Sequence, residues 1–512
     1  MMSSLYVGAT GMKSLGEGLA VVSNNLANQN TVGFRRAMML YQDLGSTNVP
    51  TSSNGMTNFS QAGKGVTPGI VRTMFENGGY ESSTTATDLS ITGIGFFAVQ
   101  KPESSEVYYT RAGNFRFTKD GDLITPNGFN LMGNKVVDGV TSGTAEPIKI
   151  DFSNTNGSQN VIPPKATTNA GFILNLGFAE SKQITNASSF TGLLSSWNGQ
   201  TDTKNFAQIS DYSTGVKIYD SEGNPQIVNG FFKYVGDVAG GNKAYEFIMT
   251  VDPKSDTRSG IQGTKSAGIL MSGTIVFDSA GNMKDMAAFV PDGSQNPEDF
   301  TTWKKAGMNA QGVPVANISF KGKNAASTAS QNVGIDFGMS FPSGWDNAID
   351  NPTQMNTLGQ NWVSNPTPGK LATHSSTAYK GTSSSKVSQD GYTTGYLSRV
   401  RIDPDGYLVG QYTNGESQNL YRIPLTRFTS QDNLTHSGNN LFSASDRVGS
   451  IEEGFPGTEN YGALTGYSLE TSNVDMTTEF VQMIVTQRGF QMNSKVVTTS
   501  DQMIQKALEL KR

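Results

Sequence analysis

Both ends of the chain carry apolar residues that recur every seven positions, and this repeat limits what the ends can fold into. A spacing of seven places side chains along one narrow stripe of an α-helix. The ends therefore predict two helices that pair as a coiled coil, the second capped by Asn473 or Asp475 and running to about Leu510. The repeat and its accompanying residues are Leu5, Met12, Leu15, Leu19, Val22 and Leu26 at one end, and Met476, Met483, Phe490, Val497 and Ile504 at the other.

Glycines make the first helix weak by itself. Gly8, Gly11, Gly16 and Gly18 each cost about 1 kcal/mol relative to alanine, and Gly33 offers a C-cap. Apolar residues also spread around the second helix beyond its repeat. Two interpretations stay open: the helices pair only with each other, or they also pack against other copies of the chain. The residues outside the repeat are Val481, Ile484, Val485, Met492, Val496 and Met503.

Between the ends the apolar pattern changes to a period of two. Short alternating runs flank Asp120-Gly121 and Asp405-Gly406, and Asp-Gly is a strong hairpin signal. The chain contains 58 glycines and only 16% charged residues, which is typical of turn-rich β structure. The predicted fold is a mainly β multidomain body of antiparallel sandwiches or barrels, with the N- and C-terminal α-helices paired as a coiled coil.

Residues for common catalytic chemistry are scarce. The chain has no cysteine and two histidines, His374 and His436, which excludes disulfides and thiol nucleophiles and leaves few acid–base or metal designs. His374 beside Ser375 lacks a Gly-x-Ser-x-Gly elbow. The segment 403–406, Asp-Pro-Asp-Gly, fails the calcium-loop pattern and predicts a hairpin turn. We therefore predict no enzyme activity, no catalytic residues, no metal site and no cofactor.

Charge and hydropathy exclude two classes of partner. The formal net charge is -5, so the chain has no basic field for nucleic acid. No apolar run approaches the roughly 18 to 20 residues that a membrane helix needs, and the first twenty residues do not resemble a cleavable signal peptide. The sequence predicts a protein that neither binds nucleic acid nor inserts into a membrane.

Several segments resemble the bacterial flagellar axial proteins, the family of rod and hook subunits. The segment 22–34 is similar to the family signature at the end of the N-terminal helix, and the last helix resembles the family's C-terminal helix. Segments 88–97 and 109–115 resemble its core β motifs, and 400–428 a later hairpin. The motif residues are Ser23, Asn24, Asn25, Leu26, Ala27, Asn28, Gly33 and Phe34, together with Asn473, Val474, Asp475, Gln487 and Arg488.

The resemblance implies a function. Rod proteins of this family are much shorter, so the length and the β insert favour the hook type. The resemblance implies a subunit that self-assembles into a flexible, curved helical tube. This tube acts as a universal joint and transmits motor torque from the rod to the filament. It also implies export in unfolded form without a cleaved signal peptide, folding of the ends on assembly, and an extracellular location in the hook and basal body.

The resemblance also implies partners and an interface. The partners are other copies of the chain, the flagellar rod, the hook cap, the hook–filament junction proteins and the export apparatus. The polymer interface comprises the repeat residues of both helices together with Ile484. Two other functions stay open: a secreted glycan-binding or adhesive β protein, which aromatic side chains clustered in a groove would favour, and a long distal-rod-like flagellar protein.

Periodicity and resemblance together predict six segments. They are an N-terminal helix (1–33), a connecting segment (34–75), the first half of a core β domain (76–150), one or two outer β domains (151–370), the second half of the core domain (371–470) and a C-terminal helix (471–512).

Overall fold

The computed structural model describes residues 2–53, 56–137, 139–151, 160–177, 191–201, 206–238, 240–321, 328–342, 344, 369–373, 375–458 and 460–510. His374 therefore lies outside the described residues. The chain divides into two compact units: unit 1 comprises Met1–Asn160 and Leu397–Arg512, and unit 2 comprises Val161–Tyr396. We predicted an insert at 151–370, and the structure places a compact unit at 161–396. The finer division into six segments stays a prediction.

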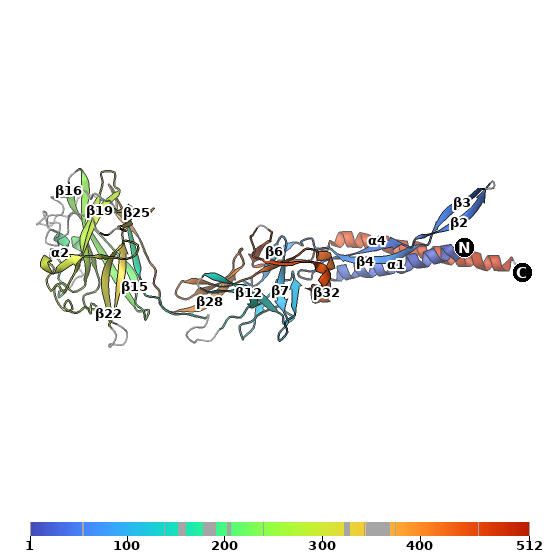
Figure 1. The fold of residues 1–512 in the computed structure, drawn as a ribbon, viewed down its shortest axis with the longest axis horizontal. Coiled ribbons are helices and arrows are strands. Elements are labelled where there is room, and N and C mark those ends of the chain that lie inside the picture. The colour runs from blue at the N-terminus through green and yellow to red at the C-terminus, as the bar shows by residue number, and fades with distance from the viewer. Residues whose placement is uncertain are drawn as a thin grey trace. The chain divides into compact units, whose positions relative to one another are not determined.

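The N-terminal and C-terminal segments of unit 1 each form a long helix. α1 (Met2–Ala27) and α4 (Met476–Glu509) lie side by side (Figure 1), which confirms the two predicted terminal helices. Asp475 supplies the predicted cap, because its side chain accepts a hydrogen bond from the backbone N–H of Thr477. The predicted cap at Gly33 is wrong, since α1 already ends at Ala27 and the chain turns before Gly33, which adopts a φ of +67°.

The segment after α1 forms two antiparallel β ribbons. β1 (Ala37–Asp43) pairs with β4 (Val66–Thr73), in a register that joins Ala37 to Thr73 and Asp43 to Val66. β2 (Ser46–Ser53) pairs with β3 (Met56–Gly63). The ribbon of β1 and β4 runs along α1 (Figure 1). A connecting segment that showed little periodicity therefore has regular structure of its own.

The β body of unit 1 is built around one branched antiparallel sheet. Its main path is β28 (Gly395–Ile402), β29 (Tyr407–Tyr412), β30 (Ser417–Arg422), β11 (Asn130–Val137), β7 (Phe96–Gln100), β8 (Val107–Thr110), β33 (Leu441–Ser443) and β32 (Thr435–Gly438). The branches are β9 (Arg116–Phe117), β10 (Leu123–Ile124), β12 (Val140–Pro147), β31 (Leu425–Phe428) and β34 (Ile451–Gly454). Separate pairs join β5 (Tyr80–Ser82) to β36 (Ser468–Glu470), and β6 (Leu89–Thr92) to β35 (Ala463–Gly466).

Two turns of this body confirm hairpin predictions. β9 and β10 pair across Asp120-Gly121, and β28 and β29 pair across Asp405-Gly406. Gly121 and Gly406 adopt φ values of +89° and +84°, a region that residues with a Cβ rarely enter.

Unit 2 contains two sheets. The first is antiparallel and follows chain order: β15 (Tyr212–Tyr219), β16 (Pro225–Val238), β17 (Asn242–Thr250), β18 (Ile269–Phe277), β19 (Met283–Pro291) and β20 (Trp303–Lys305). The second contains β21 (Gly307–Met308), β22 (Pro314–Lys321), β23 (Thr328–Asp336), β14 (Asn169–Gly177), β26 (Thr377–Tyr379) and β27 (Ser384–Gln389). β14 pairs in parallel with β23 and β26, so this sheet is mixed rather than antiparallel as predicted.

Smaller elements complete unit 2. They are β13 (Val161–Ile162), which pairs with the start of β28, together with α2 (Gly192–Ser195), α3 (Phe206–Ile209), β24 (Met339–Ser340) and β25 (Lys370–Leu371).

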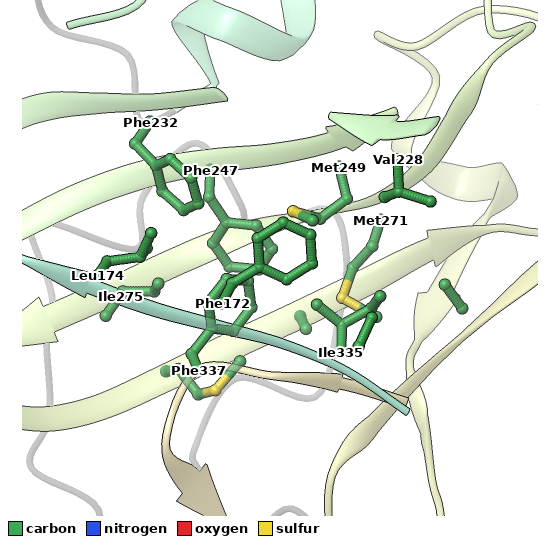
Figure 2. Close-up of a cluster of buried hydrophobic side chains, with 14 of the residues drawn as sticks. Phe172, Leu174, Val228, Phe232, Phe247, Met249, Met271, Ile275, Ile335 and Phe337 are labelled. Carbon is green, nitrogen blue, oxygen red and sulfur yellow. The ribbon is translucent and has the colours of Figure 1, made fainter. Parts of the chain in front are cut away.

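Large side chains from both sheets of unit 2 share one core. Figure 2 shows Phe172 of β14 among Phe232, Phe247 and Phe337, and all four side chains are fully buried. The rings of Phe247 and Phe337 lie 4.9 Å apart between centroids. Unit 2 is therefore a β sandwich with an aromatic core, and it provides the apolar burial on which folding depends.

Candidate functional site

The motifs at the two ends of the sequence meet in the antiparallel pair of α1 and α4. Near the N-terminus of α1, the Oγ atoms of Ser4 and Ser500 lie 3.2 Å apart. Near the other end of α1, Asn25 donates from Nδ2 to Oε2 of Glu479 at 3.1 Å. Because these contacts join the start of one helix to the end of the other, the helices run in opposite directions.

Small residues form the centre of the contact between α1 and α4. A Cβ atom added at Gly8 would lie 2.9 Å from Cγ2 of Val497, and one added at Gly11 would lie 2.9 Å from Oδ1 of Asn493. Both separations are shorter than favourable van der Waals contact. We expected these glycines to weaken α1, and the structure makes them positions where α4 approaches α1 closely.

Most of the apolar repeat lies beside the centre of the helix pair, and Val22 is the one repeat residue that is buried. The buried positions are Gly8, Gly11, Ser14, Gly18, Val22 and Asn25 on α1, and Glu479, Thr486 and Ser500 on α4. The half-buried repeat residues are Leu5, Met12, Leu15, Leu19, Leu26, Met483, Val497 and Ile504. Met476, Ile484 and Phe490 are exposed by 45%, 56% and 42%. A narrow seam of small and polar residues thus leaves the larger apolar side chains accessible.

A second face of α1 receives the ribbon of β1 and β4. Ser14 donates from Oγ to the carbonyl oxygen of Val66 at 3.3 Å. A Cβ atom at Gly18 would overlap the hydroxyl of Tyr41. Small residues therefore allow a strand, as well as a helix, to lie against α1.

Asn25 and Asn473, one motif residue from each end, fix the backbone beside the helices. The Asn25 side chain donates to the carbonyl oxygen of Ala37 at 2.8 Å and accepts from its N–H at 2.9 Å. The Asn473 side chain accepts from the N–H of Arg36 at 2.7 Å and donates to the carbonyl oxygen of Met74 at 2.9 Å. An amide offers both a donor and an acceptor, so each asparagine joins segments that are distant in sequence.

The other motif residues serve helix ends or face solvent. Asn28 donates from Nδ2 to the carbonyl oxygen of Asn24 at 2.9 Å, which satisfies a carbonyl in the last turn of α1. Hydrogen bonds from Thr478 and Thr477 lower the pKa of Asp475. Gly33 and Phe34 are buried, and Leu26 and Val474 are half-buried. The exposed motif residues are Ser23, Asn24, Ala27, Asp475, Gln487 and Arg488.

A buried charge cluster lies close to this junction, and sequence reasoning missed it. Glu470 accepts from Nη2 of Arg35 at 2.7 Å, from Nη1 of Arg111 at 3.4 Å and from the N–H of Gly78 at 3.0 Å. The three charged side chains are almost completely buried. Burial lowers the pKa of Arg111 to about 10, and Glu470 opposes this shift. The cluster ties the chain after α1 and the chain before α4 to the β body.

Two residues that could suggest catalysis or sugar binding, Ser376 and Trp197, have structural partners. Ser376 is buried and donates to the carbonyl oxygen of Phe337 at 2.7 Å, so its hydroxyl has a structural partner. Trp197 lines a pocket of 930 Å³ in unit 2, but it is only 4% exposed, and its Nε1 donates to Ala267 at 3.0 Å. It therefore provides no open aromatic platform.

Potential metal ligands are dispersed over the part of the chain that the structure describes. Within the described ranges, no group of three or more acidic and histidine side chains is arranged to hold a metal ion. None of the described helices is long and apolar enough to span a membrane.

Family comparisons agree with this architecture segment by segment. Residues 5–35 match the family described as flagella basal body rod protein, and residues 466–510 match the C-terminal region of flagellar basal body rod FlgEFG proteins. Residues 90–168 match the D1 domain of flagellar hook proteins FlgE/F/G, and residues 194–392 match the FlaE D2 domain of flagellar basal body proteins. These matches are all to flagellar rod and hook proteins, and they include both ends of the chain and the β domains between them.

Full-length relatives narrow this class. Flagellar hook protein FlgE of Borreliella burgdorferi is 28% identical and that of Treponema pallidum is 29% identical, and each alignment covers 100% of both chains. Together with the matches to hook-protein domains, these full-length similarities support a flagellar hook protein. A crystal structure of Helicobacter pylori flagellar hook protein FlgE2 aligns with 76% of this chain and 100% of its own, at 14% identity and a TM-score of 0.40.

Proposed function

We propose that copies of this chain assemble into the flagellar hook, a curved tube that works as a universal joint and passes torque from the rod to the filament. The matches to hook-protein domains and the hook proteins among its full-length relatives support this function. The same relationship supports the flagellar rod, the hook cap, the hook–filament junction proteins and the export apparatus as partners, and an extracellular location.

The observation that carries this proposal is the large apolar surface on α4. A soluble monomer rarely exposes many large apolar side chains on one element, and such surfaces mark interaction sites. Copies of the chain that pack along the helix pair would remove these side chains from water. The exposed residues outside the repeat are Val481 (57%), Ile484 (56%), Val485 (58%), Met492 (71%), Val496 (44%) and Met503 (47%).

The seam between the helices supports folding of the ends on assembly. Its buried centre contains mainly glycine, serine, threonine and asparagine, with Val22 and Glu479, so pairing α1 with α4 leaves much of the larger apolar surface in water. Helices without such burial are marginal in water. The ends would therefore stay unfolded during export, which proceeds without a cleaved signal peptide, and become ordered when neighbouring copies cover α4.

The β units suit a joint that bends without breaking. Unit 2 has its own aromatic core, so it stays folded while its surface contacts change. The permanent contacts would lie in the helix layer, and the polar outer faces of the β units would slide as the tube rotates. This arrangement gives low resistance to bending and high resistance to twisting.

Electron microscopy of cells that lack the chain tests the function. We expect rods without the curved hook, and a plasmid copy of the chain should restore the hook. Cells with normal hooks would contradict the proposal.

Circular dichroism tests folding on assembly. The full-length monomer should show the same helix signal as a chain without residues 1–70 and 471–512, and extra helix should appear only on polymerisation. A full-length monomer with the helix content of the polymer would refute coupled folding while leaving hook assembly intact.

A further inference from the structure

A pocket of 630 Å³ lies within unit 1, where the end of α1 meets the β body. Among the described residues that line this pocket, none is an aspartate or a glutamate. Its charged side chain is that of Arg35, and asparagine amides and threonine hydroxyls supply most of its other polar groups. The pocket therefore disfavours a cation and offers hydrogen-bond donors to a ligand.

The charge in the wall of this pocket is not balanced. Glu470 accepts from Nη2 of Arg35 at 2.7 Å and from Nη1 of Arg111 at 3.4 Å. Two positive charges thus share one negative charge, which leaves an excess of one positive charge. The side chains of Arg35 and Glu470 are fully buried and that of Arg111 is 3% exposed, so water and salt screen this excess poorly.

Arg35 also has hydrogen-bond donors without partners. Its Nε and Nη1 atoms are buried, and neither has an acceptor among the residues that the structure describes. A guanidinium carries five N–H donors, and burial of a donor without an acceptor is costly. An additional acceptor with a negative charge would offset the excess charge and satisfy these donors.

Neutral donors in the pocket suit the same ligand. Asn114 is half-buried and Asn127 is exposed, and neither side-chain amide has a hydrogen-bond partner in the described part of the chain. Nδ1 of His436 accepts from the N–H of Gly438 at 3.2 Å, so Nε2 of the neutral ring carries the proton and can donate. Hydrogen bonds to an ionised acceptor are stronger than those between neutral groups.

We propose that this pocket binds a small oxyanion, which offsets the excess charge of Arg35, Arg111 and Glu470. A neutral sugar would leave the excess charge in place, and a metal cation would increase it. The ligand is either a free anion, such as phosphate or sulfate, or a carboxylate of a neighbouring copy, since both present negatively charged oxygen atoms to the same donors. The inference goes beyond the proposed function, because the pocket forms within a single copy.

The position of the pocket gives the anion a structural consequence. Asn28 and Thr31, after the last turns of α1, form part of the wall, and Asn114 and Asn440 of the β body form another part. An anion that contacts both parts would hold the end of α1 against the β body. A ligand that binds only this folded arrangement stabilises it by mass action. On the proposed function, torque between the helix layer and the β body passes through this junction.

Electron cryomicroscopy of isolated hooks tests the site directly, in sodium phosphate and in sodium chloride of equal ionic strength. Hooks are the appropriate sample because the ends are proposed to fold on assembly. We expect density in the pocket within hydrogen-bonding distance of Asn114 or of the Arg35 guanidinium. A separate peak that requires phosphate would identify a free anion, and density continuous with a neighbouring copy in both salts would identify a carboxylate. A pocket with neither density would overturn the inference.

The temperature at which hooks dissociate provides an energetic test. Asn114→Asp adds a negative charge to the pocket and should weaken anion binding. Asn419→Asp is the matched control, because it makes the same change at a half-buried asparagine of β30 outside the pocket. Phosphate also strengthens apolar burial in general, and the control variant measures that effect.

For a free anion, phosphate should raise the dissociation temperature of natural and Asn419→Asp hooks more than that of Asn114→Asp hooks. For a carboxylate of a neighbouring copy, Asn114→Asp hooks should dissociate at a lower temperature than Asn419→Asp hooks in both salts. Identical behaviour of the two variants in both salts would overturn the inference.

A second variant removes the excess charge itself. Arg35→Gln leaves Arg111 and Glu470 as a balanced pair, so Arg35→Gln hooks should show no phosphate effect beyond that of Asn114→Asp. A phosphate effect as large as that of the control would contradict the role of the excess charge. Normal hooks in cells without the chain would instead reject the proposed function, whereas these outcomes concern the pocket alone.

Discussion

The core of unit 2 and the seam between α1 and α4 differ in the side chains that they bury. The core of unit 2 packs fully buried Phe172, Phe232, Phe247 and Phe337 between two sheets, whereas the seam brings helix backbones together over glycines. Burial of apolar surface contributes about 25 cal/mol per Å². The sandwich therefore obtains its stability from its own chain, while the helix pair leaves many of its large apolar side chains exposed.

The largest expected effect comes from a cavity in the sandwich. Phe247→Ala removes a fully buried ring that lies 4.9 Å from that of Phe337. Such changes cost about 3 to 5 kcal/mol, and chemical denaturation of the full chain should report this loss for unit 2. Ile227→Ala, at a side chain that is 54% exposed, is the matched control and should change the unfolding free energy by less than about 0.5 kcal/mol. Equal effects would show that the sandwich core does not stabilise unit 2.

The next effect tests the buried charges that tie the helices to the β body. Glu470→Gln leaves Arg35 and Arg111 buried without a counter-ion, and loss of one partner of a buried pair costs about 3 kcal/mol or more. Denaturation of unit 1 should therefore shift strongly. Glu452→Gln removes the exposed partner of Arg427, 2.6 Å away, and should cost at most about 1 kcal/mol. A small shift for Glu470→Gln would mean that the cluster contributes little.

A buried carboxyl gives unit 2 a pH dependence. Glu246 accepts from the N–H groups of Leu193 and Leu194 at 2.7 and 2.9 Å, and burial raises its pKa from 4.5 to about 8. The folded state therefore holds a proton that the unfolded state loses above pH 4.5. Its contribution to stability is complete below that pH and is lost as pH rises to about 8, at no more than about 1.4 kcal/mol per pH unit.

Denaturation of unit 2 across this pH range checks the sign. Stability should fall with rising pH in the natural chain, and the fall should be much smaller in Glu246→Gln. An increase of stability with pH would show that hydrogen bonds from α2 keep the carboxylate charged.

Local signals in the sequence predicted the elements that depend on local chemistry. The sevenfold repeat and Asp475, one of two candidate caps, predicted α4 and its end near Leu510, and two Asp-Gly pairs predicted hairpins. The parallel pairs of β14 were not predictable in this way, because they join strands that are far apart in sequence. The ribbon of β1 and β4 was missed because its side chains show no clear alternation of apolar and polar residues.

The sequence predicted the two helices of the candidate site, but it did not predict the small residues at the centre of their contact. The repeat identified α1 and α4 as partners, but glycine carries no apolar signal, so Gly8 and Gly11 were interpreted as defects. Asn25 and Asn473 were found through the family motifs, whereas their hydrogen bonds depend on backbone atoms that no motif specifies. Glu470 gave no signal at all, because its partners Arg35 and Arg111 are single charges hundreds of positions away in the chain.

The smallest effect on stability should accompany a large effect on assembly. Gly8→Leu places a branched side chain where even a Cβ would come within 2.9 Å of Val497, so α4 must move away from α1. The β units have separate cores, and their unfolding should stay unchanged within about 0.5 kcal/mol. Gly16→Leu is the matched control, because nothing lies within 4 Å of its Cβ position and the change favours the helix. Electron microscopy should show no hooks for Gly8→Leu and normal hooks for Gly16→Leu. Normal hooks from Gly8→Leu would show that the close seam is dispensable. A lower unfolding free energy of the β units in either variant would show that their stability depends on the helix pair, which would contradict the comparison between sandwich and seam.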